Sequence, residues 1–286
     1  MITLDILNET TPDAFAAALD GVFEHAPWVP LAAAPARPFA TVEALHAGLM
    51  DVVRSADAET QRRFLRGHPP LSATAISTAL TADSQAEQAG LGLAGLGSTA
   101  SDFAAKSEAY AEEFQFPFII CARRHTPSSV LRMLGRRLGS TEEAERAAAL
   151  QEVFYITRLR LVARVTGPGV PRTTGHLSTH VLDTGRGRPA EGVRIQLFRD
   201  GALLREGVTN RDGRTPTPFI EGEPLRIGPH ELRFHVGPYF ADWSPPVSDP
   251  PWYDVIPVPF FVTEPEGHYH TPLLVAPWQY STYRGS

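Results

Sequence analysis

Apolar residues recur every three or four positions through the first 165 residues, which is the spacing of an amphipathic helix. The stretches "TVEALHAGLMDVVRSA" and "TEEAERAAALQEVFYITRLRLVARV" follow this pattern, and Ala is abundant while β-branched residues are sparse. Thr11, Thr41 and Thr141 precede such stretches, with Pro12 or acidic residues in the first turn, as at helix N-caps. The pattern predicts an all-α domain over residues 1–165.

The hydrophobic pattern changes after "TGPGVPRTTG" at residues 166–175, a segment that has no periodicity and is rich in Gly and Pro. This composition predicts a linker. Beyond it, short β-rich runs such as "HLSTHVLD", "GVRIQLFRD", "HELRFHVG" and "HYHTPLLVA" are separated by turn pairs, Asp200-Gly201 and Asp212-Gly213 among them. We expect an all-β sandwich over residues 176–286, and so a multidomain chain with an all-α half and an all-β half.

Charge and cysteine content exclude several classes of protein. The net charge is -6 and no block of Lys and Arg occurs, which argues against nucleic acid as a partner. A lone Cys121 excludes an intrachain disulfide and indicates a reducing compartment. We also expect no signal peptide at the start and no membrane span, because no window approaches ~20 uninterrupted apolar residues. A cytoplasmic protein is therefore expected.

Three stretches of the β half carry a family signature: "STHVLDTGRGRPAEGV", "TNRDGRT" and "HYHTPLLVAPWQYSTYRGS". Together they resemble 5-hydroxyisourate hydrolases, the enzymes of the transthyretin-like family, over residues 175 to 286. The resemblance implies a transthyretin-like sandwich, a site at a subunit interface and a homotetramer formed through this domain. It implies catalytic roles for His180 and His270. It also implies substrate binding by Arg214, Tyr283, Arg284, Gly285 and Ser286.

The chemistry of these side chains agrees with hydrolysis of a cyclic amide. An imidazole titrates near neutrality and can take the proton of an attacking water, while a guanidinium offers paired donors to a developing oxyanion. Two other interpretations stay open. Arg214 in an Asp-Gly-Arg turn is also typical of plain surface, and His180, His268 and His270 are a possible zinc-ligand set, although we expect no metal. For His176, His230, His235 and His268 we expect structural roles.

The helical half resembles another family through "RGHPPLSATAISTALTADSQAEQAGLGL" and "FQFPFIICARRH". These stretches are similar to decarboxylases of 2-oxo-4-hydroxy-4-carboxy-5-ureidoimidazoline (OHCU), and the likeness extends over roughly residues 5 to 165. The resemblance implies an all-helical fold, no cofactor, and catalytic roles for His68 and Glu87. The residues it implies for substrate binding are Pro69, Ser84, Gln88, Ile119, Ile120, Cys121, Ala122, Arg123 and Arg160.

One position departs from that family, which usually reads H-P-D-L-A-G where this chain reads "HPPLSA". Pro70 replaces an Asp that either caps the following helix or holds His68 in one tautomer, and both interpretations stay open. Asp83 or Ser84 followed by Glu87 or Gln88 also has the form of a capping box. Other side chains have simpler explanations. Cys121 lies in an apolar run and is expected in the core rather than as a nucleophile, and surface or core roles suffice for His25, His46 and His125.

Both resemblances concern consecutive reactions, so the sequence predicts a bifunctional enzyme of urate degradation. The β half would open 5-hydroxyisourate to OHCU, and the helical half would decarboxylate OHCU to (S)-allantoin. Small molecules are therefore the expected partners. The alternatives are a hydrolase with a degenerate helical scaffold, or a transthyretin-like binding protein without activity.

Overall fold

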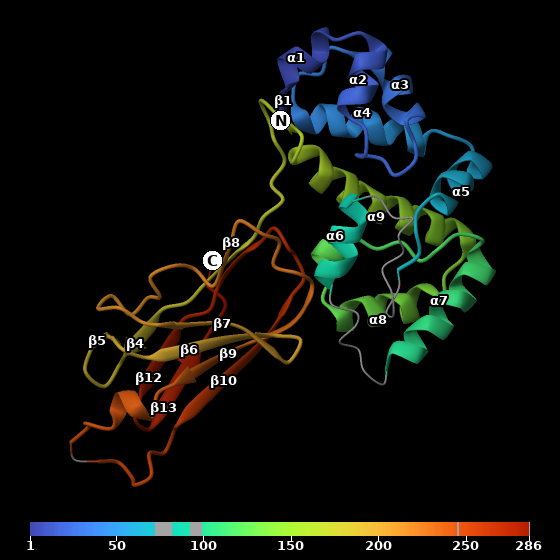
Figure 1. The fold of residues 1–286 in the computed structure, drawn as a ribbon. Helices are drawn as coiled ribbons and strands as arrows, with labels where there is room; N and C mark the ends of the chain where they lie inside the picture. Colours follow the sequence, from blue (N-terminus) through green and yellow to red (C-terminus); the bar gives the residue numbers. More distant parts are fainter. Residues whose placement is uncertain (72–81, 92–98, 245, 286) are drawn as a thin grey trace. The chain divides into compact units, whose positions relative to one another are not determined.

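The chain divides between Thr173 and Thr174 into two compact units, a helical unit and a β unit (Figure 1). This computed structural model describes residues 1–71, 82–91, 99–244 and 246–285. Within this described part, no helix combines the length and apolarity needed to cross a membrane.

Helices make up nearly all of the regular structure described in the first unit. They are α1 (Leu4–Glu9), α2 (Pro12–Ala18), α3 (Trp28–Ala33), α4 (Val42–Arg54), α5 (Ala58–Arg66), α6 (Ala82–Leu91), α7 (Ala100–Phe114), α8 (Pro127–Arg137) and α9 (Glu142–Val162), with short 3-10 turns η1 (Ala34–Ala36) and η3 (Ala122–Arg124). The predicted caps are confirmed, because the hydroxyls of Thr11, Thr41 and Thr141 each accept a backbone N–H three residues later. Each cap thereby satisfies an otherwise orphaned donor.

A two-stranded pairing that the helical pattern does not predict joins the ends of the helical unit. Strands β1 (Ile2–Thr3) and β2 (Val165–Thr166) run parallel. The next residues of the expected linker pack on the same unit, because the carbonyls of Pro168 and Gly169 accept the N–H groups of the first two residues of α4, at 2.9 and 3.2 Å. Gly169 permits this approach, since a Cβ atom there would lie 2.8 Å from the Cβ of Thr41.

The β unit is strand-rich, as its alternating pattern predicts. Its strands are β3 (His176–Ser178), β4 (Val181–Asp183), β5 (Arg188–Pro189), β6 (Arg194–Arg199), β7 (Ala202–Val208), β8 (Ile220–Glu221), β9 (Gly228–His235), β10 (Val255–Val262), β11 (His268–His270), β12 (Leu273–Ala276) and β13 (Gln279–Thr282). They form sheets in the orders β10-β9-β6-β7, β11-β3-β8 and β13-β12-β4-β5. Alternate residues of β9 are buried, and the core joins side chains of β6, β9 and β10 to those of β3, β4, β11 and β12.

Two expected strands are each broken, and the breaks lie beside each other. The run "HLSTHVLD" divides into β3 and β4, and "HYHTPLLVA" divides into β11 and β12, with β11 parallel to β3 and β12 parallel to β4. Across the breaks, the hydroxyl of Thr179 donates to the carbonyl of Thr271 at 2.7 Å, and the N–H of Leu273 donates to the carbonyl of His180 at 2.8 Å. These bonds bring His180 and His270 into the same part of the unit.

Candidate active sites

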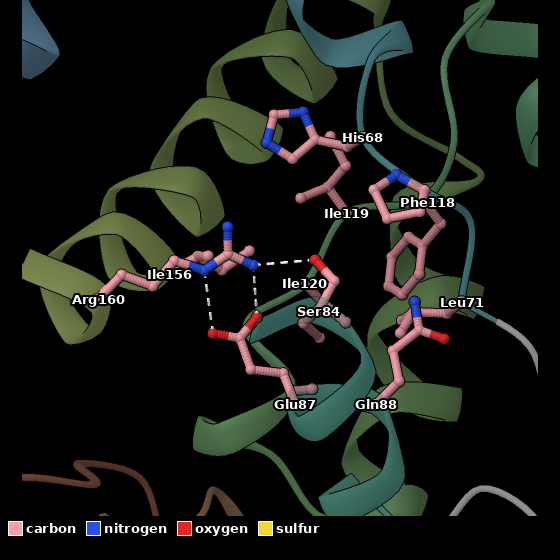
Figure 2. Close-up of a pocket in the computed structure, with 12 residues that line it drawn as sticks. His68, Leu71, Ser84, Glu87, Gln88, Phe118, Ile119, Ile120, Ile156 and Arg160 are labelled. Atoms are coloured by element: carbon pink, nitrogen blue, oxygen red, sulfur yellow. Dashed lines mark hydrogen bonds and ion pairs between the residues drawn. The ribbon is translucent and has the colours of Figure 1, made fainter. Parts of the chain in front are cut away.

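A pocket in the helical unit collects side chains from four separate segments of the chain (Figure 2). Its polar members are His68, Ser84, Glu87, Gln88 and Arg160. All five belong to the set predicted from the sequence. Apolar walls complete the pocket, and they are formed by Pro69, Leu71, Phe118, Ile119, Ile120, Ala122 and Ile156.

Arg160 organises the polar side of this pocket. Its Nε and one terminal nitrogen donate to the two carboxylate oxygens of Glu87, at 3.1 and 2.8 Å, and the same terminal nitrogen donates to Ser84 Oγ at 2.9 Å. The guanidinium is only 5% exposed. Burial by itself would lower its pKa, but the hydrogen bonds and negative charges of Glu87 and Glu24 together hold that pKa above the usual value. Arg160 is therefore a permanent positive charge that fixes the carboxylate of Glu87 at the pocket.

His68 presents a neutral imidazole to the pocket. Its Nδ1 lies 3.2 Å from the carbonyl oxygen of Phe64, so Nδ1 carries the proton and donates it there. Burial lowers the pKa of His68 to about 4, against the opposing effects of the Phe64 carbonyl and the charge of Glu24. Nε2 is therefore unprotonated at neutral pH and can accept a proton from a ligand.

The segment from Ile119 to Arg123 contributes only part of what its motif predicts. Ile119, Ile120 and Ala122 line the pocket, whereas Cys121 and Arg123 do not. Cys121 is buried, burial raises the pKa of its thiol, and its backbone N–H donates to Glu152, so it belongs to the core. Arg123 is exposed. The motif could not resolve which residues of the segment face the pocket, and substrate binding by them stays a prediction.

The capping-box interpretation of the α6 sequence does not hold. Asp83 and Ser84 both lie within the described part of helix α6, Ala82–Leu91, so neither is its N-cap. Ser84 instead bonds to a residue behind the pocket, because its hydroxyl donates to Glu24 Oε2 at 3.0 Å. Pro70 is exposed, does not line the pocket, and accepts a hydrogen bond from Gln88 through its carbonyl at 3.3 Å. Any helix that Pro70 begins would fall in residues 72–81, outside the described part.

The second site lies in the β unit, at the two strand breaks. A surface pocket there is lined by His270, Arg214, Ser178 and Thr179, together with His176, Thr215, Pro218 and His268. The Nδ1 of His270 lies 3.0 Å from Ser178 Oγ. Burial lowers the pKa of His270, and the charge of Arg214 lowers it further, so this imidazole is also neutral near pH 7.

His180 lies beside this pocket and completes the group. Its Nε2 is buried and has no hydrogen-bond partner among the described residues. Burial lowers the pKa of His180, and Arg214 lowers it further. Gly213 lies against the same ring, because a Cβ atom there would be 2.3 Å from the carbonyl oxygen of Val181 and 3.0 Å from His180 Cδ2. The Asp-Gly-Arg turn therefore needs glycine, with a φ of +72°, to bring Arg214 near both imidazoles.

The C-terminal residues are tied to this site through Gly285. Its N–H donates to the carbonyl of His270 at 2.7 Å, in an antiparallel bridge. The guanidinium of Arg284 lies 4.8 Å from the centre of the Tyr269 ring, a cation–π distance. Tyr283 is 59% exposed and does not line the pocket. Ser286 was predicted to bind substrate but lies outside the described residues.

Of the other histidines, His176 and His268 line the β pocket, and a structural role for each stays a prediction. Among the described residues, no three His, Cys, Asp or Glu side chains form a group able to hold a metal. His268 stacks edge-on against His176, with ring centres 4.7 Å apart. His46 and His125 are buried and bonded to Thr157 and Ser129.

Sequence motifs missed some pocket residues in the helical unit. The aromatic wall Phe118 and the aliphatic Ile156 line the pocket, and Glu24 supports it from behind through Ser84. Phe118 precedes a segment already singled out. Glu24 lies some 60 residues from Ser84, and no spacing in the sequence connects the two.

Comparisons with known proteins assign each unit to a family. The chain matches the OHCU decarboxylase family over residues 8–162 and the HIUase/transthyretin family over residues 177–285. The crystal structure of an (S)-allantoin synthase is similar over the whole of both chains, with 34% sequence identity and a TM-score of 0.54.

Single-domain relatives match each half. A 5-hydroxyisourate hydrolase of Deinococcus radiodurans is 52% identical over 119 residues, which cover 40% of this chain and 99% of that protein. An OHCU decarboxylase of Haloferax volcanii is 35% identical over 164 residues, which cover 57% of this chain and 96% of that protein.

Proposed function

The chain belongs to the OHCU decarboxylase family through its helical unit and to the HIUase/transthyretin family through its β unit, and we propose that it catalyses two consecutive steps of urate degradation. The β unit hydrolyses 5-hydroxyisourate to OHCU, and the helical unit decarboxylates OHCU to (S)-allantoin. The observation that carries this proposal is that each unit gathers its family's motif residues around one pocket: His68 with Glu87 and Arg160, and His270 with Arg214.

Hydrolysis at the β site needs a base for water and a stabiliser for the oxyanion. His180 and His270 are suited to the first task, because burial and Arg214 lower the pKa of each and keep each imidazole unprotonated near pH 7. Arg214 is exposed and available to the second task. Water adds to the amide carbonyl as its proton passes to an imidazole. Collapse of the tetrahedral intermediate then breaks the C–N bond, and the departing nitrogen takes a proton.

Decarboxylation at the helical site needs no cofactor, because the imidazoline C=N bond can accept the electron pair that CO2 leaves behind. The ring nitrogen that receives this pair takes a proton from water, which gives a neutral enol. The enol becomes allantoin when its hydroxyl loses a proton and the neighbouring ring carbon gains one. A neutral His68 fits this relay, since its Nε2 can take the first proton and return it to one face of the carbon. Delivery to one face gives a single enantiomer.

The degenerate-scaffold alternative has little support from the pocket. Pro70, the departure from the family motif, does not line the pocket. Meanwhile His68 holds its Nδ1 proton on the Phe64 carbonyl, so its tautomer is set without an aspartate. The alternative of an inactive carrier is disfavoured by the two histidines near Arg214 and by the bridge that ties Gly285 to His270.

We also propose that the β unit assembles as a homotetramer, which would place its exposed site between subunits. The free edge of β10 is unsuited to pairing with a strand of another subunit. The carbonyl of Asp254, just before β10, accepts the N–H of Val236, just after β9. Even-numbered residues of β10 therefore bond to β9, and the N–H groups of odd-numbered residues point away from it. Pro257 and Pro259 occupy two of these positions and have no N–H, whereas β13 at the edge of its sheet contains no proline. Light scattering tests the proposal: a monomer that still hydrolyses 5-hydroxyisourate would contradict it.

One assay tests the two activities together. Freshly prepared 5-hydroxyisourate is added to the protein, its loss is followed by ultraviolet absorbance, and the allantoin formed is followed by circular dichroism. We expect rapid loss of the substrate and then a signal of (S)-allantoin. Rapid loss followed by racemic allantoin would leave the hydrolase and refute the decarboxylase.

We propose that the protein is cytoplasmic. A cytoplasmic location is supported by the lone buried thiol of Cys121, which suits a reducing compartment. Fractionation of cells that express the full chain, with immunoblotting, tests it.

A further inference from the structure

Glu24 is a buried carboxylate that no motif analysis singled out, and it belongs to the helical site. It lies in the connection between α2 and α3 and is 2% exposed. Its Oε2 accepts from Arg160 at 2.6 Å and from Ser84 Oγ at 3.0 Å. It does not line the active-site pocket itself. Glu24 therefore touches two pocket residues from the side that faces the protein interior.

The hydrogen bonds of Arg160 account for all five of its N–H groups. One terminal nitrogen donates to Glu24 and, at 3.3 Å, to the carbonyl of Gly21. The remaining edge, formed by Nε and the other terminal nitrogen, donates to Glu87 and Ser84. An arginine has five such donors in a rigid plane, so the orientation of the guanidinium is fully determined. The edge turned toward the pocket is the one that holds Glu87.

Charge balance gives the two carboxylates different roles. One positive charge on Arg160 lies between two carboxylates, and the Glu24 side chain is 1% exposed while that of Glu87 is 16% exposed. A buried carboxylate needs a partner, so Glu24 depends on Arg160. Glu87 borders the pocket and can exchange a bond to Arg160 for a bond to a ligand N–H. Without Glu24, Arg160 would have Glu87 as its only carboxylate partner among the described residues.

We propose that Glu24 is a positioning residue of the decarboxylase site, which neutralises Arg160 from behind and so leaves Glu87 available to accept hydrogen bonds from the substrate's ureido and ring N–H groups. This inference rests on the proposed decarboxylase function. Glu24 also acts on His68: burial lowers the pKa of that imidazole and the Phe64 carbonyl partly offsets the effect, and the negative charge of Glu24 adds to the offset.

The test replaces Glu24 by Gln, which keeps the shape and an acceptor oxygen but removes the charge. We expect a folded protein whose kcat for (S)-allantoin falls roughly 10- to 100-fold, because Glu87 is then held by Arg160, while KM changes by less than about threefold. The NMR titration of His68 should move to lower pH, since a negative charge that favours imidazolium has been removed. Hydrolysis of 5-hydroxyisourate should be unchanged.

Two further variants separate positioning from plain structure. Glu43→Gln removes an exposed carboxylate that pairs with Arg158 and should leave kcat and the His68 titration unchanged. Glu24→Asp keeps the charge, so its His68 titration should stay near that of the parent and its kcat should exceed that of Glu24→Gln. If Gln and Asp lose kcat equally and neither moves the His68 titration, Glu24 is merely structural and the inference is wrong. A parent protein that yields only racemic allantoin would instead refute the decarboxylase function.

Discussion

Gly285 lies so close to His270 that a Cβ atom at position 285 would be 2.8 Å from Cδ2 of the imidazole and 3.1 Å from its Cβ. The same two residues share a backbone hydrogen bond of 2.7 Å. No real side chain fits at such a distance without displacement of the ring or the chain. The close approach of His270 thus explains why position 285, in the terminal Y-R-G-S, is glycine.

Gly285→Ala is expected to reduce hydrolysis of 5-hydroxyisourate at least tenfold. The added methyl group must push either the imidazole of His270 or the terminal segment out of place, and a small misplacement of a catalytic group is costly. Steady-state rates of both reactions provide the measurement, and decarboxylation should not change. Gly135→Ala is the control, because a Cβ atom there meets nothing within 4 Å. A fully active Gly285→Ala protein would show that the terminal segment is not part of the site.

Truncation after Thr282 is expected to abolish ring opening and leave the fold intact. Strand β13 ends at Thr282, so its pairing with β12 survives, and the residues removed include none of the buried core. The truncated chain would lack the bridge from Gly285 to His270. Circular dichroism and thermal unfolding report the fold, and ultraviolet absorbance reports the reaction. Undiminished hydrolysis would contradict the assignment of these residues to the site.

The sequence predicted the two halves and most of the side chains that line the helical pocket, because each depends on local patterns. Helical periodicity and the threonine caps act within a few residues, and they located α4 and α9 almost to the residue. Motifs likewise identified His68, Glu87 and Arg160. Glu24 could not be found this way, because its role arises from contacts 60 and 136 residues away. The breaks in the strands before Val181 and Leu273 depend on cross-strand hydrogen bonds, so the alternating pattern alone suggested unbroken strands.

Substitution of one histidine in each unit should separate the two activities. His68→Ala is expected to abolish enzymatic decarboxylation and spare hydrolysis, and His180→Ala to do the reverse. Proton transfer by a positioned side chain typically contributes ~100- to 10,000-fold, so each loss should be plain in the rates. The product's handedness is decisive: without His68, allantoin should form only by slow spontaneous decay and be racemic. Formation of (S)-allantoin at the parent rate by His68→Ala would show that the helical site is misplaced.

Buried histidines should make the helical unit lose stability as the pH falls below neutrality. Burial lowers the pKa of His46 to about 3, that of His125 to about 3 and that of His68 to about 4. In the unfolded chain each titrates near ~6.5, so between that pH and the folded value the unfolded state binds more protons. Stability therefore rises with pH in this window and is lost on acidification, by up to ~1.4 kcal/mol per pH unit for each histidine.

Urea unfolding of the full chain, followed by circular dichroism at 222 nm at several pH values, measures this dependence. His46→Asn removes one buried imidazole, so its unfolding free energy should fall less steeply between about pH 6 and pH 4, by ~1 kcal/mol per pH unit relative to the parent. His25→Asn is the matched control: His25 is 58% exposed at a φ of +48°, a conformation that asparagine tolerates. If both variants keep the slope of the parent, His46 does not stay neutral in the folded protein. That result would contradict a pKa of about 3 for His46 in the folded protein.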